Sequence, residues 1–287
     1  MDYKNIIAVN GHGMNVYITG KGSDTIVFLS GAGVSSPVLE YKPLYSLLSD
    51  EFRIAVIEKK GYGFSDANTG APRDIKNMTD ESREALAKAG VKPPYILAAH
   101  SYSGIEAVYW ANTYPEEVRA VLGLDMASPR FALAQAKELP EEKKRAMVER
   151  NEKLYRKLCG SKILQKLLKK QTTEATGVLK CGALSEEEKK LYCELFYKNL
   201  CNGEISAEQV AATSNAVTAS ETGKLKVPGY MFISDMKTPM RKTTWRAENE
   251  AFAKENEWVI SHAESHFYYA QQPQKIADAW KKYIKSL

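Results

Sequence analysis

Ser101 lies at a tight turn between an apolar segment and a helical one, and such a turn can present a nucleophile. Residues 95–99 are strand-like, and small side chains stand on both sides of the serine at Ala99, Ser103 and Gly104. A sharp strand-to-helix turn strains the backbone of its central residue and lifts that side chain above the sheet. The pattern indicates an exposed, reactive serine, and a serine in an ordinary turn is the alternative.

Attack by a serine on a carbonyl group builds negative charge on the carbonyl oxygen, so the reaction needs fixed hydrogen-bond donors. The backbone amide of Tyr102, which directly follows the serine, is one candidate. A second donor should come from the loop Gly31-Ala32-Gly33, which follows the apolar run 25–30 and in which glycine lets the backbone turn sharply. A plain tight turn is the competing interpretation of this loop.

A serine hydroxyl also needs a neighbouring imidazole that can take its proton. The four histidines of the chain are His12, His100, His262 and His266. His12 falls in an N-terminal turn, and His100 should point the other way along the strand because strand side chains alternate. Two candidates for the base therefore remain, His262 and His266.

Residues 99–104 resemble the nucleophile turn of the α/β-hydrolase family, although Ala99 and Ser103 stand where that family prefers glycine. The resemblance implies that Ala32 supplies the second donor of an oxyanion hole. In the same loop, Ser30 replaces the usual histidine of the family.

Three further segments resemble parts of this family. Residues 58–66 are similar to its Gly-x-Gly-x-Ser-Asp turn after the fourth strand, and residues 114–119 match a second stretch. Residues 264–273 resemble the loop after the last strand, where a histidine precedes an aromatic residue and a later proline opens the final helix. This resemblance favours His266 as the base, with His262 as the alternative.

The acid that would orient the histidine has two candidates. In most of the family it follows the strand that corresponds to residues 227–234, and here Lys237 stands in its place. Some relatives carry the acid after the preceding strand, where this chain has Asp125. We prefer Asp125, with Asp235 as the alternative, because geometry and not chain order defines a triad. The competing interpretation of Asp125 is a helix-capping or loop-bracing residue.

The elements that must position these residues alternate between strands and helices. The apolar run 25–30 suits a strand covered on both faces, as in a parallel sheet flanked by helices. Other predicted strands are 15–19, 53–58, 95–99, 118–124, 227–234 and 258–261, and predicted helices are 74–89, 105–112 and a C-terminal one with Ile276, Trp280 and Ile284 on one face. The alternation predicts an α/β fold with a doubly wound, mostly parallel sheet.

Between residues 128 and 224 we find helical spacing and no convincing strand. We expect residues 1–127 and 225–287 to form one hydrolase core and residues 128–224 to be an inserted helical cap over the serine. Within the insertion, residues 153–170 carry seven cations and no acid, interleaved with leucine and isoleucine. We expect a solvated helix packed on the core; contact with an anionic membrane, or admission of an acidic or acyl substrate, is the alternative.

The composition is that of an ordinary globular protein, with 44% hydrophobic and 26% charged residues. A net charge of +5 does not argue for nucleic acid as a partner. The sequence shows neither a signal peptide nor an apolar run of the roughly 18 residues that a membrane span needs, so we expect a cytoplasmic protein. The cysteines should be reduced thiols and not a zinc site, with disulfides as the alternative; they are Cys159, Cys181, Cys193 and Cys201.

These features predict a serine hydrolase that cleaves a carboxylic ester or related small acyl compound and requires no metal or cofactor. Haloalkane dehalogenases and epoxide hydrolases share the fold but use an aspartate nucleophile, so Ser101 argues against both. Serine aminopeptidase and carbon–carbon bond hydrolase activities remain compatible with the motif. The alternative from another functional class is a non-catalytic ligand-binding protein, which Lys237 at the usual position of the acid favours.

Overall fold

The computed structural model describes residues 2–200, 202–238 and 244–287. Its strands are β1 (Ile6–Val9), β2 (His12–Gly20), β3 (Thr25–Leu29), β4 (Arg53–Glu58), β5 (Tyr95–Ser101), β6 (Val118–Met126), β7 (Gly229–Ile233) and β8 (Val259–His262). In the described residues they form one sheet with the order β1-β2-β4-β3-β5-β6-β7-β8. The pairs β1–β2 and β2–β4 are antiparallel, and the pairs from β4 through β3, β5, β6 and β7 to β8 are parallel.

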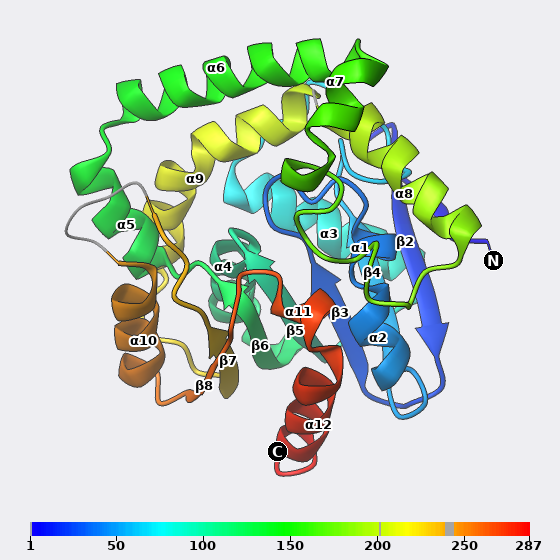
Figure 1. The fold of residues 1–287 in the computed structure, drawn as a ribbon. Coiled ribbons are helices and arrows are strands. Elements are labelled where there is room, and N and C mark those ends of the chain that lie inside the picture. The colour runs from blue at the N-terminus through cyan, green and yellow to red at the C-terminus, as the bar shows by residue number, and fades with distance from the viewer. Residues whose placement is uncertain (1, 201, 239–243) are drawn as a thin grey trace.

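Helices cover both faces of this sheet (Figure 1). They are α1 (Pro37–Glu40), α2 (Lys42–Leu48), α3 (Ile75–Lys88), α4 (Ser103–Thr113), α5 (Pro129–Glu138), α6 (Glu141–Cys159), α7 (Lys162–Leu167), α8 (Glu186–Asn199), α9 (Gly203–Glu221), α10 (Trp245–Glu255), α11 (Tyr268–Gln271) and α12 (Pro273–Ile284). Side chains of α3, α4 and α10 join one core, and those of α2, α11 and α12 join the other. The chain is thus an α/β protein with a doubly wound, mostly parallel sheet, as its sequence predicts.

The two cores meet at β3, whose five residues are all buried. Val27 and Leu29 belong to the core with α3 and α4, whereas Ile26 and Phe28 belong to the core with α2 and α12. Alternate residues of a strand face opposite sides of the sheet, so a continuous apolar run is what a doubly covered strand requires. The interpretation of residues 25–30 is confirmed.

Most predicted elements are present with small shifts at their ends. β2 is longer than predicted, and β5 extends as far as Ser101. In α12 the side chains of Ile276, Trp280 and Ile284 are buried together, which confirms the predicted apolar face. The antiparallel pairing of β1 with β2 is harder to predict from sequence, because β1 has only four residues and is partly exposed.

The described residues between β6 and β7 form helices α5 to α9 and no strand. These helices lie across the edge of the sheet at which the parallel strands end (Figure 1). α9 packs against α4 and α5, and α6 lies outside α9. The insertion is therefore placed above the end of β5, where Ser101 lies.

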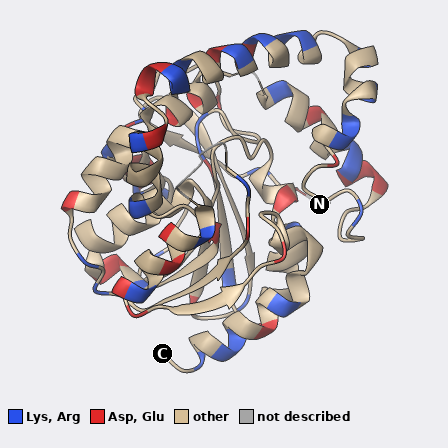
Figure 2. Cartoon of the chain, turned by 60° about the vertical axis from the view of Figure 1, so that its left-hand side comes forward, with Lys and Arg blue, Asp and Glu red and all other residues tan. Residues whose placement is uncertain are grey.

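The basic segment predicted to pack on the core does so only in part. Leu158 of α6 is buried, but Leu154 is 48% exposed, and Ile163 and Leu167 of α7 are 75% and 70% exposed. The prediction of a packed apolar face is wrong for these three residues. For Ile163 and Leu167 the reason is that α7 packs mainly against α6 and not against the core. Lysine and arginine recur along the same outer helices (Figure 2).

The cysteines and the possible metal ligands can be described within the same residue ranges. Cys181 and Cys193 are free thiols, and Cys201 lies outside the described residues. Within residues 2–200, 202–238 and 244–287 no three His, Cys, Asp or Glu side chains are grouped as metal ligands.

None of the helices in the described ranges is both long enough and apolar enough to cross a membrane.

Candidate active site

Ser101 is the last residue of β5 and adopts a left-handed backbone conformation, with φ of +52°. Such a conformation strains a residue other than glycine, and surrounding contacts must hold it. The hydroxyl of Ser103 supplies one such contact, because it accepts a hydrogen bond from the His100 amide at 2.9 Å and lies 2.9 Å from the Leu29 carbonyl oxygen. At the position where the family prefers glycine, Ser103 thus joins the turn to β3.

The loop after β3 lies directly against the serine. A Cβ added to Gly31 would lie 2.6 Å from the Ser101 Cβ, which is closer than two carbon atoms can approach without displacement. Ala32 and Tyr102 line the same cavity as Ser101. No protein acceptor within the described residues takes the amide hydrogen of Ala32 or of Tyr102. Both residues predicted to supply donors therefore border the cavity of Ser101.

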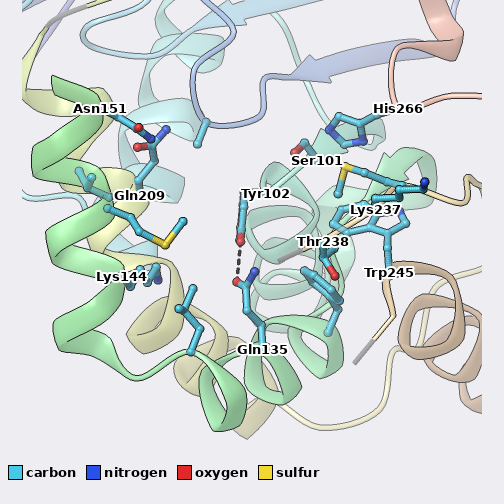
Figure 3. Close-up of a pocket in the computed structure, with 16 residues that line it drawn as sticks. Ser101, Tyr102, Gln135, Lys144, Asn151, Gln209, Lys237, Thr238, Trp245 and His266 are labelled. Carbon is cyan, nitrogen blue, oxygen red and sulfur yellow. Dashed lines mark hydrogen bonds between the residues drawn. The ribbon is translucent and has the colours of Figure 1, made fainter. Parts of the chain in front are cut away.

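Asp125 and His266 form a close pair, and His266 lines this cavity. Asp125, at φ of +48° in β6, is 1% exposed, and its Oδ2 accepts a hydrogen bond from Nδ1 of His266 at 2.7 Å. A carboxylate only accepts, so Nδ1 carries the proton and Nε2 remains free to accept another. The ring of His266 lies beside Ser101 (Figure 3).

Two residues that the sequence analysis missed hold Asp125 in place. Its Oδ1 accepts from the Ser234 amide and from Nε1 of Trp245, each at 2.7 Å. Its Oδ2 also accepts from the Ser234 hydroxyl at 2.6 Å. Asp125 does not cap α5, because Ser128 does so, but it does brace the end of β7. The loop-bracing interpretation is therefore compatible with contact to His266.

The alternative candidates for the acid and the base, Asp235 and His262, lie outside the cavity. Asp235 is exposed, and its Oδ1 is 2.6 Å from Nε of Arg246. Nδ1 of the exposed His262 contacts the same guanidinium group. Neither Asp235 nor His262 lines the cavity, whereas Lys237, at the usual place of the acid, does. The structure brings Asp125, and not Asp235, to His266.

His100 has a neighbour that strand alternation did not predict. It does not line the cavity, but its ring centroid is 4.6 Å from that of His266, and its Nε2 is 3.1 Å from the His266 carbonyl oxygen. Burial, with the nearby His266 as a smaller cause, lowers the pKa of His100 well below its usual value. A neutral His100 with its proton on Nε2 can donate to that carbonyl and hold the loop that carries His266.

The cavity beside Ser101 has a volume of about 340 Å³, within the range common for small-molecule sites. The core contributes one wall, and helices α5, α6 and α9 contribute the facing wall (Figure 3). The lining residues are Ala32, Ser101, Tyr102, Phe131, Gln135, Leu139, Lys144, Met147, Val148, Asn151, Gln209, Met236, Lys237, Thr238, Trp245 and His266. The Tyr102 hydroxyl donates to Gln135 Oε1 at 2.7 Å and links the two walls.

A buried polar network connects α9 to the loop next to Ser101. Lys59 forms a buried ion pair with Glu208 of α9, and the Tyr62 hydroxyl donates to Glu208 Oε2 at 2.7 Å. The same Tyr62 oxygen is 3.4 Å from the amide nitrogen of Gly33. The loop that carries Ala32 is thus held through Tyr62 to the inserted helices.

The sequence is similar to that of several known proteins. No protein-family model matches the sequence. The chain is 31% identical over 278 residues to YbdG, an uncharacterized protein of Bacillus subtilis, and the match covers 94% of this chain and 82% of YbdG. Pimeloyl-[acyl-carrier protein] methyl ester esterase of Aliivibrio salmonicida is 32% identical over 113 residues, 39% of each chain.

Solved structures share the fold over nearly the whole chain. The epoxide hydrolase of Vigna radiata superposes with a TM-score of 0.70 at 18% identity, covering 99% of this chain and 97% of that one. The chain thus has the α/β-hydrolase fold, as the resemblance of its motifs implied.

Proposed function

We propose that this protein is a serine hydrolase that cleaves a carboxylic ester or related acyl compound through an acyl-serine intermediate. The observation that carries the proposal is the 2.7 Å contact between His266 Nδ1 and Asp125 Oδ2 at the cavity that contains Ser101. In this proposal Ser101 is the nucleophile, His266 the general base and Asp125 the residue that orients it.

The reaction would proceed in two steps. His266 Nε2 takes the proton of Ser101 while its Oγ forms a bond to the carbonyl carbon, and the amides of Ala32 and Tyr102 stabilise the oxyanion. The bond from that carbon to the alcohol oxygen then breaks, and His266 returns the proton to the departing alcohol. Water, deprotonated by His266, attacks the acyl-serine, and the carboxylic acid leaves as Ser101 regains its proton.

Ester hydrolysis is favoured over the other chemistries of this fold for two reasons. Epoxide hydrolases are similar in structure, but their nucleophile is an aspartate, whereas this turn carries Ser101. The Aliivibrio relative is named as a methyl ester esterase, which supports an ester as the substrate. The non-catalytic alternative rested on Lys237 at the usual acid position, and it loses weight because Asp125 is available as the acid.

The proposal extends to the inserted helices. Residues 128–224 would act as a cap that shapes the substrate site on a core of residues 1–127 and 225–287. Support comes from α5, α6 and α9, which supply the cavity wall opposite Ser101. A cap that excludes water strengthens the electrostatic interactions within the site.

A fluorophosphonate probe tests the central claim, because it reacts with activated serines. The native protein should be labelled and should release acid from a simple methyl ester, and Ser101→Ala should abolish both. Ser214→Ala, at an exposed serine of α9, is the matched control and should leave both unchanged. Equal labelling of the native protein and Ser101→Ala, or no labelling of either, would contradict the proposal.

A further inference from the structure

The cavity next to Ser101 carries an unbalanced positive charge. Its described lining includes two lysines, Lys144 and Lys237, and neither aspartate nor glutamate. Within the described part of the chain no carboxylate forms an ion pair with either lysine. The nearby acids have other partners: Glu141 pairs with Arg145, and Asp235 pairs with Arg246.

Lys144 is the more informative of the two lysines because it is partly buried. Its Nζ lies 3.0 Å from the hydroxyl oxygen of Thr213 on α9, which is a neutral partner. Burial lowers the pKa of Lys144, with the Arg145 charge as a minor contribution and Glu141 acting in the opposite direction. An ammonium group removed from water without a counterion is destabilised, and an anion bound beside it would reverse that loss.

The position of Lys144 fixes where such an anion would lie. Lys144 projects from α6 on the side of the cavity opposite Ser101, and Lys237 lies near Ser101 (Figure 3). Apolar side chains of Phe131, Leu139 and Val148 line the same cavity. This arrangement suits a molecule with an ester at Ser101, an aliphatic spacer and an anionic group at Lys144.

We infer, on the basis of the proposed ester hydrolysis, that the substrate is an ester carrying a carboxylate at the far end of an aliphatic spacer, and that Lys144 binds this carboxylate. Lys144 is then a specificity-determining residue. The carboxylate belongs either to the acyl part, as in a half-ester of a dicarboxylic acid, or to the alcohol part. Both arrangements present the same chemistry to Lys144.

The test compares isosteric substrates that differ in charge. Monomethyl esters of dicarboxylic acids of increasing length are compared with counterparts in which a carboxamide replaces the free carboxylate. A second series places the same two groups on the alcohol side of acetate esters. We expect kcat/KM for the carboxylate member to exceed that of its carboxamide partner by about 10- to 100-fold at the best spacer length in one series. Equal values throughout both series would overturn the inference.

Variants of α6 assign the preference to Lys144. Lys144→Met should remove the preference by raising KM for the carboxylate substrates more than for their carboxamide counterparts, and Lys144→Arg should retain the preference. Lys143→Met, at the exposed neighbour on the same helix, is the matched control. Equal loss on charged and neutral substrates in Lys144→Met would also overturn the inference. If native protein cleaves no ester and no probe labels Ser101, the proposed function fails instead, so the two failures are distinguishable.

Discussion

Ser234 donates two hydrogen bonds to Asp125, one from its backbone amide and one from its hydroxyl. β7 is the strand after which most of the family carries the acid, and here its end supplies the groups that hold an acid from β6. The pairing of β6 with β7 brings Asp125 next to Ser234, because the preceding residues Leu124 and Phe232 are register partners. The carboxylate therefore reaches His266 from the neighbouring strand.

Replacement of Asp125 should have a far larger effect than replacement of Asp235. Asp125→Asn should lower kcat on a simple ester by about 10⁴-fold, because an amide cannot hold the His266 tautomer that accepts the serine proton. Asp235→Asn should leave kcat close to native, because Asp235 contacts Arg246 at the surface. Melting temperatures of both variants control for folding. Equal loss in both variants, or a larger loss in Asp235→Asn, would contradict the assignment of the acid.

Ser234→Ala should reduce turnover without abolishing it. The change removes the hydroxyl that donates to Asp125 Oδ2 and leaves the backbone amide bond to Oδ1. A hydrogen bond to a charged group is worth about 1.5–3 kcal/mol, so kcat should fall by about 10- to 100-fold. Ser261→Ala, on β8 and outside the cavity lining, is the control and should keep the native kcat. An unchanged kcat in Ser234→Ala would show that its hydroxyl does not position Asp125.

Gly31→Ala should impair the chemical step. The added methyl group would lie 2.6 Å from the Ser101 Cβ, so the loop that carries Ala32 must move away from the serine. Loss of one oxyanion donor typically costs about 10²- to 10³-fold in kcat. Gly160→Ala is the control, because an added Cβ there meets no atom closer than 3.6 Å. Steady-state kinetics with one ester measure the effect, and a change in KM alone would argue against an oxyanion role for this loop.

Glu40 should make stability depend on pH. Burial raises the pKa of Glu40 to about 7, although the hydroxyls of Tyr269 and Tyr192 bond to it and oppose the shift. A carboxyl whose pKa is higher in the folded state contributes stability that is complete below its unfolded pKa, near 4.5, and is lost as the pH rises through 7.

Urea unfolding at acidic and alkaline pH tests this prediction. At about 1.4 kcal/mol per pKa unit, the contribution of Glu40 is on the order of 3 kcal/mol. Glu40→Gln should remove most of that pH dependence and unfold at a higher urea concentration than the native protein above pH 8. The exposed Glu116→Gln should keep the native pH dependence. A native pH profile in Glu40→Gln would refute the role of this carboxyl.

Residue patterns over short stretches of sequence were sufficient to predict much of the fold and part of the candidate active site. The buried run at β3 and the small residues around Ser101 report directly on backbone geometry, so both could be read from sequence. The choice between Asp125 and Asp235 could not, because it depends on the left-handed backbone of Asp125 and on contacts with Ser234 and Trp245, which are more than 100 positions away.

The exposed apolar side chains of α7 illustrate the same limit. Helical spacing predicts that Ile163 and Leu167 share a side of the helix, but it does not predict whether another element covers that side. The sequence around His100 did not predict its contact with the His266 carbonyl oxygen, because the two residues are 166 positions apart.

The ion pair between Lys59 and Glu208 has a consequence for how substrate enters. Separation of α9 from the core would remove Glu208 from the buried Lys59 and leave Glu106, at 3.8 Å, as the ion-pair partner of that lysine, which should cost free energy. We therefore expect α9 to remain docked on the core while substrate enters and leaves the cavity at Ser101. Because Tyr62 joins Glu208 to the loop at Gly33, a docked α9 would also keep the amide of Ala32 next to Ser101.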